Sequence, residues 1–246
     1  MLAADIIGLD PWWAVVAVTI VFVGSALQAS IGVGLGLLAA PTLSLIDPDF
    51  IPGALTVCVV PLTVGMTIRE RHHIDRSGIS RAVVGRFLGV VIGAALIVNM
   101  SQSAIAVVIG LSVLLAVIGS LTGLHFDPTP RNLFVAGTAS GFSGTVAGVG
   151  GPPMALTYQN SDPRTLRATL ATFNMIGSTF TIPSLAIAGV IGRRELQLAL
   201  MLVPGVLIGL WVGRFTIARL PPERVRPFVL IVCAASALVL LARQLA

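Results

Sequence analysis

Several of the few polar side chains in the apolar stretches of this chain flank two glycine clusters. The first cluster is Gly32-Val33-Gly34-Leu35-Gly36, and Gln28 and Ser30 precede it. The second is Gly148-Val149-Gly150-Gly151-Pro152-Pro153, and Thr145 precedes it. Amides and hydroxyls hydrogen-bond polar ligands, and helices that restart after a break aim N–H groups and a positive dipole end at whatever lies there. The expected chemistry is therefore the non-covalent recognition of an anion.

The composition places these clusters in a membrane. Of the 246 residues, 56% are hydrophobic and only 10% are charged, against about a quarter charged in an ordinary soluble domain. Such a chain lacks the polar residues needed to cover a water-exposed surface, which excludes a soluble enzyme and a nucleic-acid partner. The surrounding solvent is predicted to be the lipid bilayer, and the fold an all-α polytopic helical bundle.

The uncharged stretches indicate where the helices lie. A straight transmembrane helix needs about 20 residues, so the stretch 87–124 must hold two helices that turn near Asn99, Ser101 and Gln102. Two other long stretches contain the glycine clusters, which are poor helix interiors. We expect discontinuous helices at both clusters.

An offset of 116 residues aligns the two halves of the chain. It places Gly32 on Gly148, Gly34 on Gly150 and Thr56 on Thr172. We therefore expect one membrane domain, 1–246, built from a first repeat, 11–125, and a second repeat, 127–243. Five segments in each repeat would invert the second relative to the first, as in many secondary transporters. A count of eight full spans is the alternative to ten segments.

Charged residues between the helices predict the orientation. Arg69, Arg71, Arg76 and Arg81 lie in one basic loop, which is expected on the cytoplasmic side. The same count puts Asp47 and Asp49 outside, and it leaves Arg193, Arg194 and Arg243 outside as exceptions to the rule.

The substrate site is expected between the two glycine clusters, because irregular backbone at membrane depth is tolerated where it lines a cavity or is buried by protein. Asn174 is the strongest single polar candidate, and close helix packing is the alternative explanation for the glycines. Arg86 and Arg214 are expected to extend to the membrane interface. The predicted substrate-binding residues are Gln28, Ser30, Gly32, Gly34, Gly36, Thr56, Thr145, Gly148, Gly150, Gly151, Thr172 and Asn174.

A second glycine pattern predicts helix packing. Gly85, Gly89 and Gly93 recur at every fourth residue, and so do Gly205, Gly209 and Gly213. Each set forms a smooth stripe along one helix face. The stripes join segments within one half, join the two halves, or mediate a homodimer.

Enzyme motifs are missing or incomplete. Gly141-Phe142-Ser143-Gly144 resembles the serine motif of rhomboid proteases, but no histidine follows His125 to activate Ser143. No nucleotide-binding motif is present, so transport driven by ATP within this chain is excluded. No catalytic residue, metal site or cofactor is expected, and Cys58 and Cys233 are interpreted as buried thiols.

Taken in order, the two glycine breaks with Pro41 after the first, the loop ending His72-His73-Ile74-Asp75 and the Gly89/Gly93 helix resemble the sulfite exporter TauE/SafE family of membrane permeases. The similarity covers the chain from about Trp12 to Leu241. The first break departs from the more usual triple glycine by having Leu35 between Gly34 and Gly36. The resemblance implies export of sulfite, organosulfonates such as sulfoacetate, or related organic acids across a bacterial inner membrane.

The expected function is therefore secondary transport of a small anion by alternating access. A proton or a sodium ion is the candidate coupling ion. An anion channel and a structural membrane protein without transport activity are the alternatives.

Overall fold

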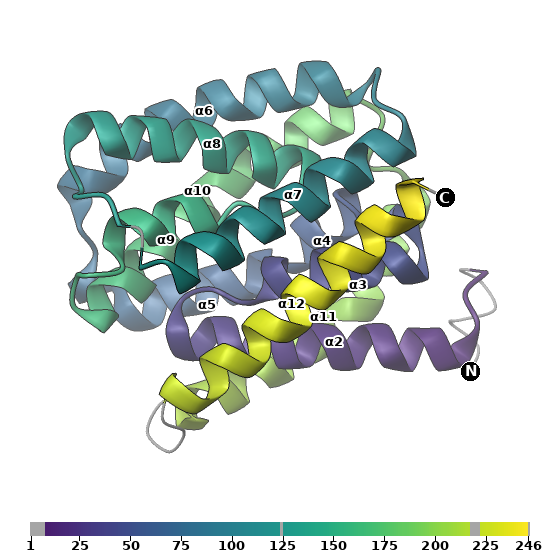
Figure 1. Ribbon diagram of the computed structural model, residues 1–246, viewed down its shortest axis with the longest axis horizontal. Helices are drawn as coiled ribbons and strands as arrows, with labels where there is room; N and C mark the ends of the chain where they lie inside the picture. Colours follow the sequence, from purple (N-terminus) through teal and green to yellow (C-terminus); the bar gives the residue numbers. More distant parts are fainter. Residues whose placement is uncertain (1–7, 124, 217–221, 246) are drawn as a thin grey trace.

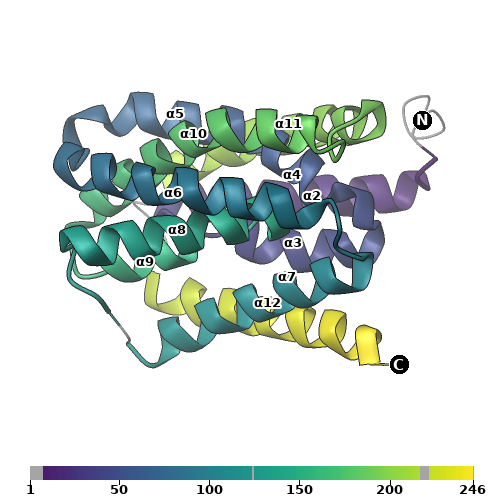
Figure 2. The same cartoon turned by 90° about the horizontal axis from the view of Figure 1, so that it is seen from above.

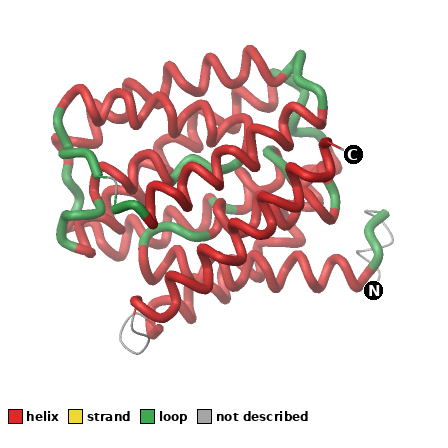
Figure 3. Tube along the Cα trace, in the orientation of Figure 1, coloured by secondary structure: helices red, strands yellow, loops and turns green. Residues whose placement is uncertain are grey.

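The computed structural model is all-helical over residues 8–123, 125–216 and 222–245, which are the residues it describes. Figure 3 shows helices joined by short loops, with no strand in the described part of the chain. This confirms the predicted all-α class. Among the described residues, six stretches are long and apolar enough to cross a membrane, by length and composition: Pro11–Ile31, Pro48–His73, Arg76–Ile97, Gln102–Leu121, Pro163–Ile187 and Arg193–Phe215.

The first half of the chain forms these elements: α2 (Pro11–Ile31), α3 (Leu35–Ile46), η1 (Pro48–Phe50), α4 (Gly53–Cys58), α5 (Val60–Glu70), η2 (Arg71–His73), α6 (Arg76–Ile97) and α7 (Gln102–Leu121). The second half forms α8 (Pro130–Ala147), α9 (Pro152–Tyr158), α10 (Pro163–Ile187), α11 (Arg193–Thr216) and α12 (Pro222–Leu245).

Side-chain caps explain where several helices begin. Asp10, Asp75, Ser101, Thr129 and Asp162 each accept a hydrogen bond from a backbone N–H in the first turn of the next helix. Such caps satisfy N–H groups that have no partner within the helix. The cap at Ser101 confirms the predicted turn between α6 and α7.

The helices lie side by side, and their connections gather at two ends of the molecule (Figures 1 and 2). The start of α2 and the end of α12 lie at one end, with the connection between α6 and α7. The connection between η2 and α6 lies at the opposite end. The outward faces carry large apolar side chains, such as Leu115 and Leu200, which are 67% and 72% exposed. A bilayer would cover them.

The two glycine stripes bring helix backbones together across the two halves. A Cβ atom added at Gly93 on α6 would lie 3.0 Å from Thr145 on α8, and α6 packs along α8. One at Gly209 on α11 would lie 2.5 Å from the carbonyl oxygen of Phe22, and α11 packs along α2. Both glycine stripes therefore join the first half of the chain to the second, which is one of the three roles that the sequence left open.

Candidate functional site

The two glycine clusters interrupt helices and meet each other. Helix α2 ends at Ile31 and α3 begins at Leu35, and Gly32 between them has a φ of 92°. Helix α8 ends at Ala147 and α9 begins at Pro152, after Gly148 with a φ of 69°. Glycine tolerates this left-handed backbone, whereas a β-carbon strains it.

The contact between the breaks is close. A Cβ atom at Gly36 would lie 2.8 Å from the carbonyl oxygen of Gly148, and one at Gly151 would lie 3.6 Å from Val33. Small residues at these positions therefore allow segments from the two halves to face each other.

A cavity of about 60 Å³ lies between the two breaks. This size suits a few ordered waters or a small polyatomic ion. Nine of the twelve residues predicted for the site line it: Gln28, Gly32, Gly34, Gly36, Thr56, Gly148, Gly150, Gly151 and Asn174. Helices α6, α8 and α10 supply further lining residues, among them Arg86, Gly144, Ser178 and Thr181.

The other three predicted residues are absent from this lining. The Ser30 hydroxyl donates to the carbonyl oxygens of Ala26 and Gly213. Thr145 donates to the carbonyl oxygen of Gly141, and Thr172 to that of Ala168. Each hydroxyl is used to hydrogen-bond helix backbone, which is the common role of Ser and Thr in membrane helices.

Arg86 corrects the sequence interpretation. It was expected to extend to the membrane interface, but it is only 5% exposed and its side chain lines the cavity. Its Nη1 donates to Asn174 Oδ1 at 2.9 Å, and its Cζ lies 4.6 Å from the centre of the Phe173 ring. Gly177 provides the space for the guanidinium, since a Cβ atom there would overlap Nε.

Arg86 was misplaced because the uncharged stretch 87–124 puts the start of this helix too late in the sequence, whereas α6 begins at Arg76. Because Asp75 caps this helix and it runs from Arg76 to Ile97, Arg86 lies in its middle, about 15 Å from the start. That distance is too long for an arginine to extend along its own helix to the interface. Arg214, near the end of α11, packs against the Trp211 and Phe215 rings instead.

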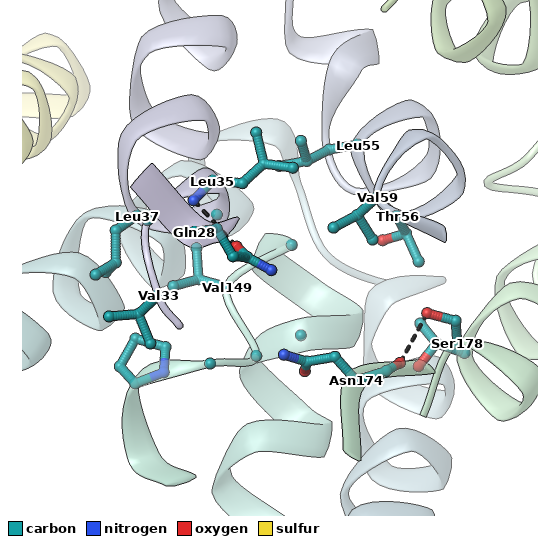
Figure 4. Close-up of a pocket in the computed structure, with 18 of the residues that line it drawn as sticks. Gln28, Val33, Leu35, Leu37, Leu55, Thr56, Val59, Val149, Asn174 and Ser178 are labelled. Atoms are coloured by element: carbon teal, nitrogen blue, oxygen red, sulfur yellow. Dashed lines mark hydrogen bonds between the residues drawn. The ribbon is translucent and has the colours of Figure 1, made fainter. Parts of the chain in front are cut away.

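The polar groups around Arg86 leave donors open toward the cavity. Gln28 Oε1 accepts the Leu35 N–H at 3.1 Å, and Asn174 Oδ1 accepts Arg86. The amide oxygens are therefore occupied, and Figure 4 shows both amide groups directed toward the space between the breaks. The Thr181 hydroxyl and Arg86 Nε are buried without a hydrogen-bond partner in the described structure.

The charge of the cavity is positive. Among the described residues that line it, Arg86 alone is charged, and no described carboxylate lies within ion-pair distance of its guanidinium. A buried cation without a counter-charge is unfavourable in a medium of low dielectric constant. An anion in the cavity would supply the missing counter-charge.

Ion pairs join the two halves at both ends of the molecule. Glu70 at the end of α5 accepts from Arg167 Nε on α10 at 3.2 Å. At the opposite end, Arg194 of α11 pairs with Asp47 and Asp49 at 2.6 and 2.7 Å. The loop residues His72 and His73 are exposed.

Asp75 adds a polar contact at the Glu70 end. Its Oδ2 accepts the Tyr158 hydroxyl at 2.8 Å, and its Oδ1 accepts the Ser77 and Gly78 N–H groups. Partial burial raises the pKa of Asp75, but these hydrogen bonds together outweigh it, so the pKa lies below its usual value. The carboxylate form is thereby favoured.

A family model for the sulfite exporter TauE/SafE matches residues 16–240, which is nearly the whole chain. The chain belongs to the sulfite exporter TauE/SafE family. The resemblance seen in the sequence is thus confirmed, and this TauE/SafE protein is a multi-pass membrane transporter. No curated protein and no solved structure matches it.

Proposed function

We propose that this TauE/SafE protein is a secondary transporter of small anions and that the cavity between the two breaks is its substrate site. The substrates we expect are sulfite, organosulfonates or related organic acids, moved across a bacterial inner membrane. The observation that carries the proposal is the Arg86 guanidinium, buried in the cavity without a carboxylate partner.

The neighbouring groups support recognition of oxyanions. With their amide oxygens occupied, Gln28 and Asn174 offer N–H donors, and Thr181 offers a hydroxyl. Arginine provides several donors in a planar fork that suits oxyanions such as carboxylates and phosphates. Asn174 also orients Arg86 through their hydrogen bond, so it acts on the substrate directly and through the arginine.

Each half of the chain packs one long helix along a helix of the other half, and this reciprocal packing supports an inverted repeat. Helix α6 of residues 11–125 packs along α8 of residues 127–243, and α11 of the second part packs along α2 of the first. Gly85 contacts Phe134, and Gly205 contacts Val18, so equivalent contacts recur. The positions 18 and 134 differ by 116, whereas 85 and 205 differ by 120. Judged by these contacts, α11 is displaced by four residues, about one helical turn, from the position that the offset of 116 residues gives it.

Alternating access would use this arrangement. The ion pairs at the two ends of the molecule join opposite halves, and the cavity lies where the halves meet. Breaking one set while keeping the other would open the cavity to one side at a time. A proton or sodium gradient is the proposed driving force, since the sequence has no nucleotide-binding motif.

Both glycine stripes are used for helix packing within the chain, so a homodimer would need another surface.

The test is anion binding and flux with matched arginine variants. Arg86→Gln removes the cavity charge, whereas Arg81→Gln removes an exposed arginine on the same helix. We expect sulfite, methanesulfonate or acetate to raise the Tm of the wild type and of Arg81→Gln, and to have no effect on Arg86→Gln. Saturable uptake into proteoliposomes should follow the same order. Equal anion binding by all three proteins would refute the proposal.

A further inference from the structure

The charge of the cavity is limited to about one elementary charge. Helices α2 and α8 end at the breaks, and α3 and α9 begin there. Helix ends carry opposite partial charges of about half an elementary charge, so two negative and two positive ends cancel to a first approximation. Pro152 and Pro153 lack N–H groups, which weakens the positive end of α9 further. Arg86 remains as the single full charge among the lining residues that the structure describes.

We infer, on the basis of the proposed function, that the site selects its substrate by charge state and takes singly charged anions in preference to doubly charged anions of the same shape. A monoanion beside Arg86 forms a neutral pair. A dianion leaves one negative charge buried without a partner, and such a charge is costly away from water.

The lining leaves little means of compensating a second negative charge. Leu37, Leu55, Val33, Val59 and Val149 supply apolar walls. The Leu35 N–H is already bonded to Gln28, and the Val149 N–H to the Ser143 carbonyl oxygen. Neutral amide and hydroxyl donors remain, and they stabilise either charge state without restoring neutrality.

The experiment compares two anions that share a tetrahedral shape and a methyl group. Methanesulfonate carries one charge at all ordinary pH values. Methylphosphonate carries one charge in mild acid and two in mild base, because the second proton of a phosphoryl group leaves near neutral pH. Binding of both to the purified full-length protein is measured by calorimetry from mildly acidic to mildly basic pH. Methanesulfonate then serves as the control for titration of the protein itself.

We expect the affinity for methanesulfonate to stay constant and that for methylphosphonate to fall by at least about tenfold as its second proton is lost. Arg86→Lys retains the charge without the planar fork, so it should bind both anions more weakly and keep the same discrimination. Loss of that discrimination in Arg86→Lys would overturn selection by charge count.

The other outcomes separate the two proposals. If methylphosphonate binds equally well or better as a dianion, selection by charge is wrong and the anion site stands. If neither anion binds at any pH and sulfite also fails to bind, the proposed function is wrong and the inference falls with it.

Discussion

Gly177→Ala is the most specific perturbation of the site, because it moves Arg86 without changing any charge. A Cβ atom at position 177 would lie 2.5 Å from Arg86 Nη2 and would overlap Nε and Cζ. The guanidinium is the far end of a flexible side chain, so we expect it to be displaced while α10 stays in place. Its hydrogen bond to Asn174 would then be lost.

The size of the effect follows from that displacement. A hydrogen bond to a charged group contributes about 1.5 to 3 kcal/mol, and a substrate anion that loses such a contact binds about tenfold to a hundredfold more weakly. Alanine itself favours the helix by about 1 kcal/mol over glycine. A loss of affinity with little loss of Tm is therefore expected.

The assay is anion binding to four purified proteins that form a double-mutant cycle: the wild type, Gly177→Ala, Arg86→Lys, which is expected to retain weaker binding, and the double variant. Once Arg86 is replaced, the alanine has no guanidinium to displace, so the two effects should be strongly non-additive. Thr179→Ala on the exposed face of α10 is the control and should bind as the wild type does. Additive effects, or normal binding by Gly177→Ala, would refute the assigned position of Arg86.

Three further predictions concern the ends of the molecule. Glu70→Gln leaves Arg167 with a weaker partner and should reduce stability by about 1 to 3 kcal/mol, seen as a lower Tm; an unchanged Tm would contradict a structural ion pair. The pKa of Asp75 is lower in the folded protein than its ordinary value of about 4. Its carboxylate therefore contributes fully to folding stability above that ordinary pKa, and this contribution is lost as the pH falls through the folded pKa. The Tm difference between wild type and Asp75→Asn should accordingly shrink in acid, and a constant difference would count against it. Ser80→Cys should react with an impermeant thiol reagent only from the cytoplasm and Val98→Cys only from outside. Ser80 lies near the start of α6, Val98 directly follows its end, and both are exposed, whereas the two native cysteines are buried. Reversed labelling would invert the predicted topology.

Composition and local pattern were sufficient for much of the architecture. A chain with so few charges must expose its apolar side chains to lipid, which requires helices that satisfy their own backbone. Ser101 and Asn99 interrupt an apolar run too long for one helix, and the structure ends α6 and begins α7 there. Glycine clusters also stand out without tertiary information, since few other residues adopt a positive φ.

Tertiary packing decided which polar groups face the cavity. Ser30 and Thr145 lie near the breaks in sequence, and Thr172 lies two residues before Asn174, but all three hydroxyls bond to helix backbone. The direction of a side chain on a helix depends on its angle around the axis, and the neighbour it meets depends on how other helices pack. Proximity along the chain predicts neither.

By itself, the sequence determined the membrane class, the all-helical fold, the family and the two glycine clusters, because hydrophobic runs and backbone freedom are local properties. Only the tertiary structure decided that Arg86 lies in a cavity, that Gly177 makes space for it and that Asn174 is its partner. Arg86 and Asn174 are 88 residues apart. Their contact depends on α6 packing against α10, which results from the combined surfaces of several helices rather than from either segment alone.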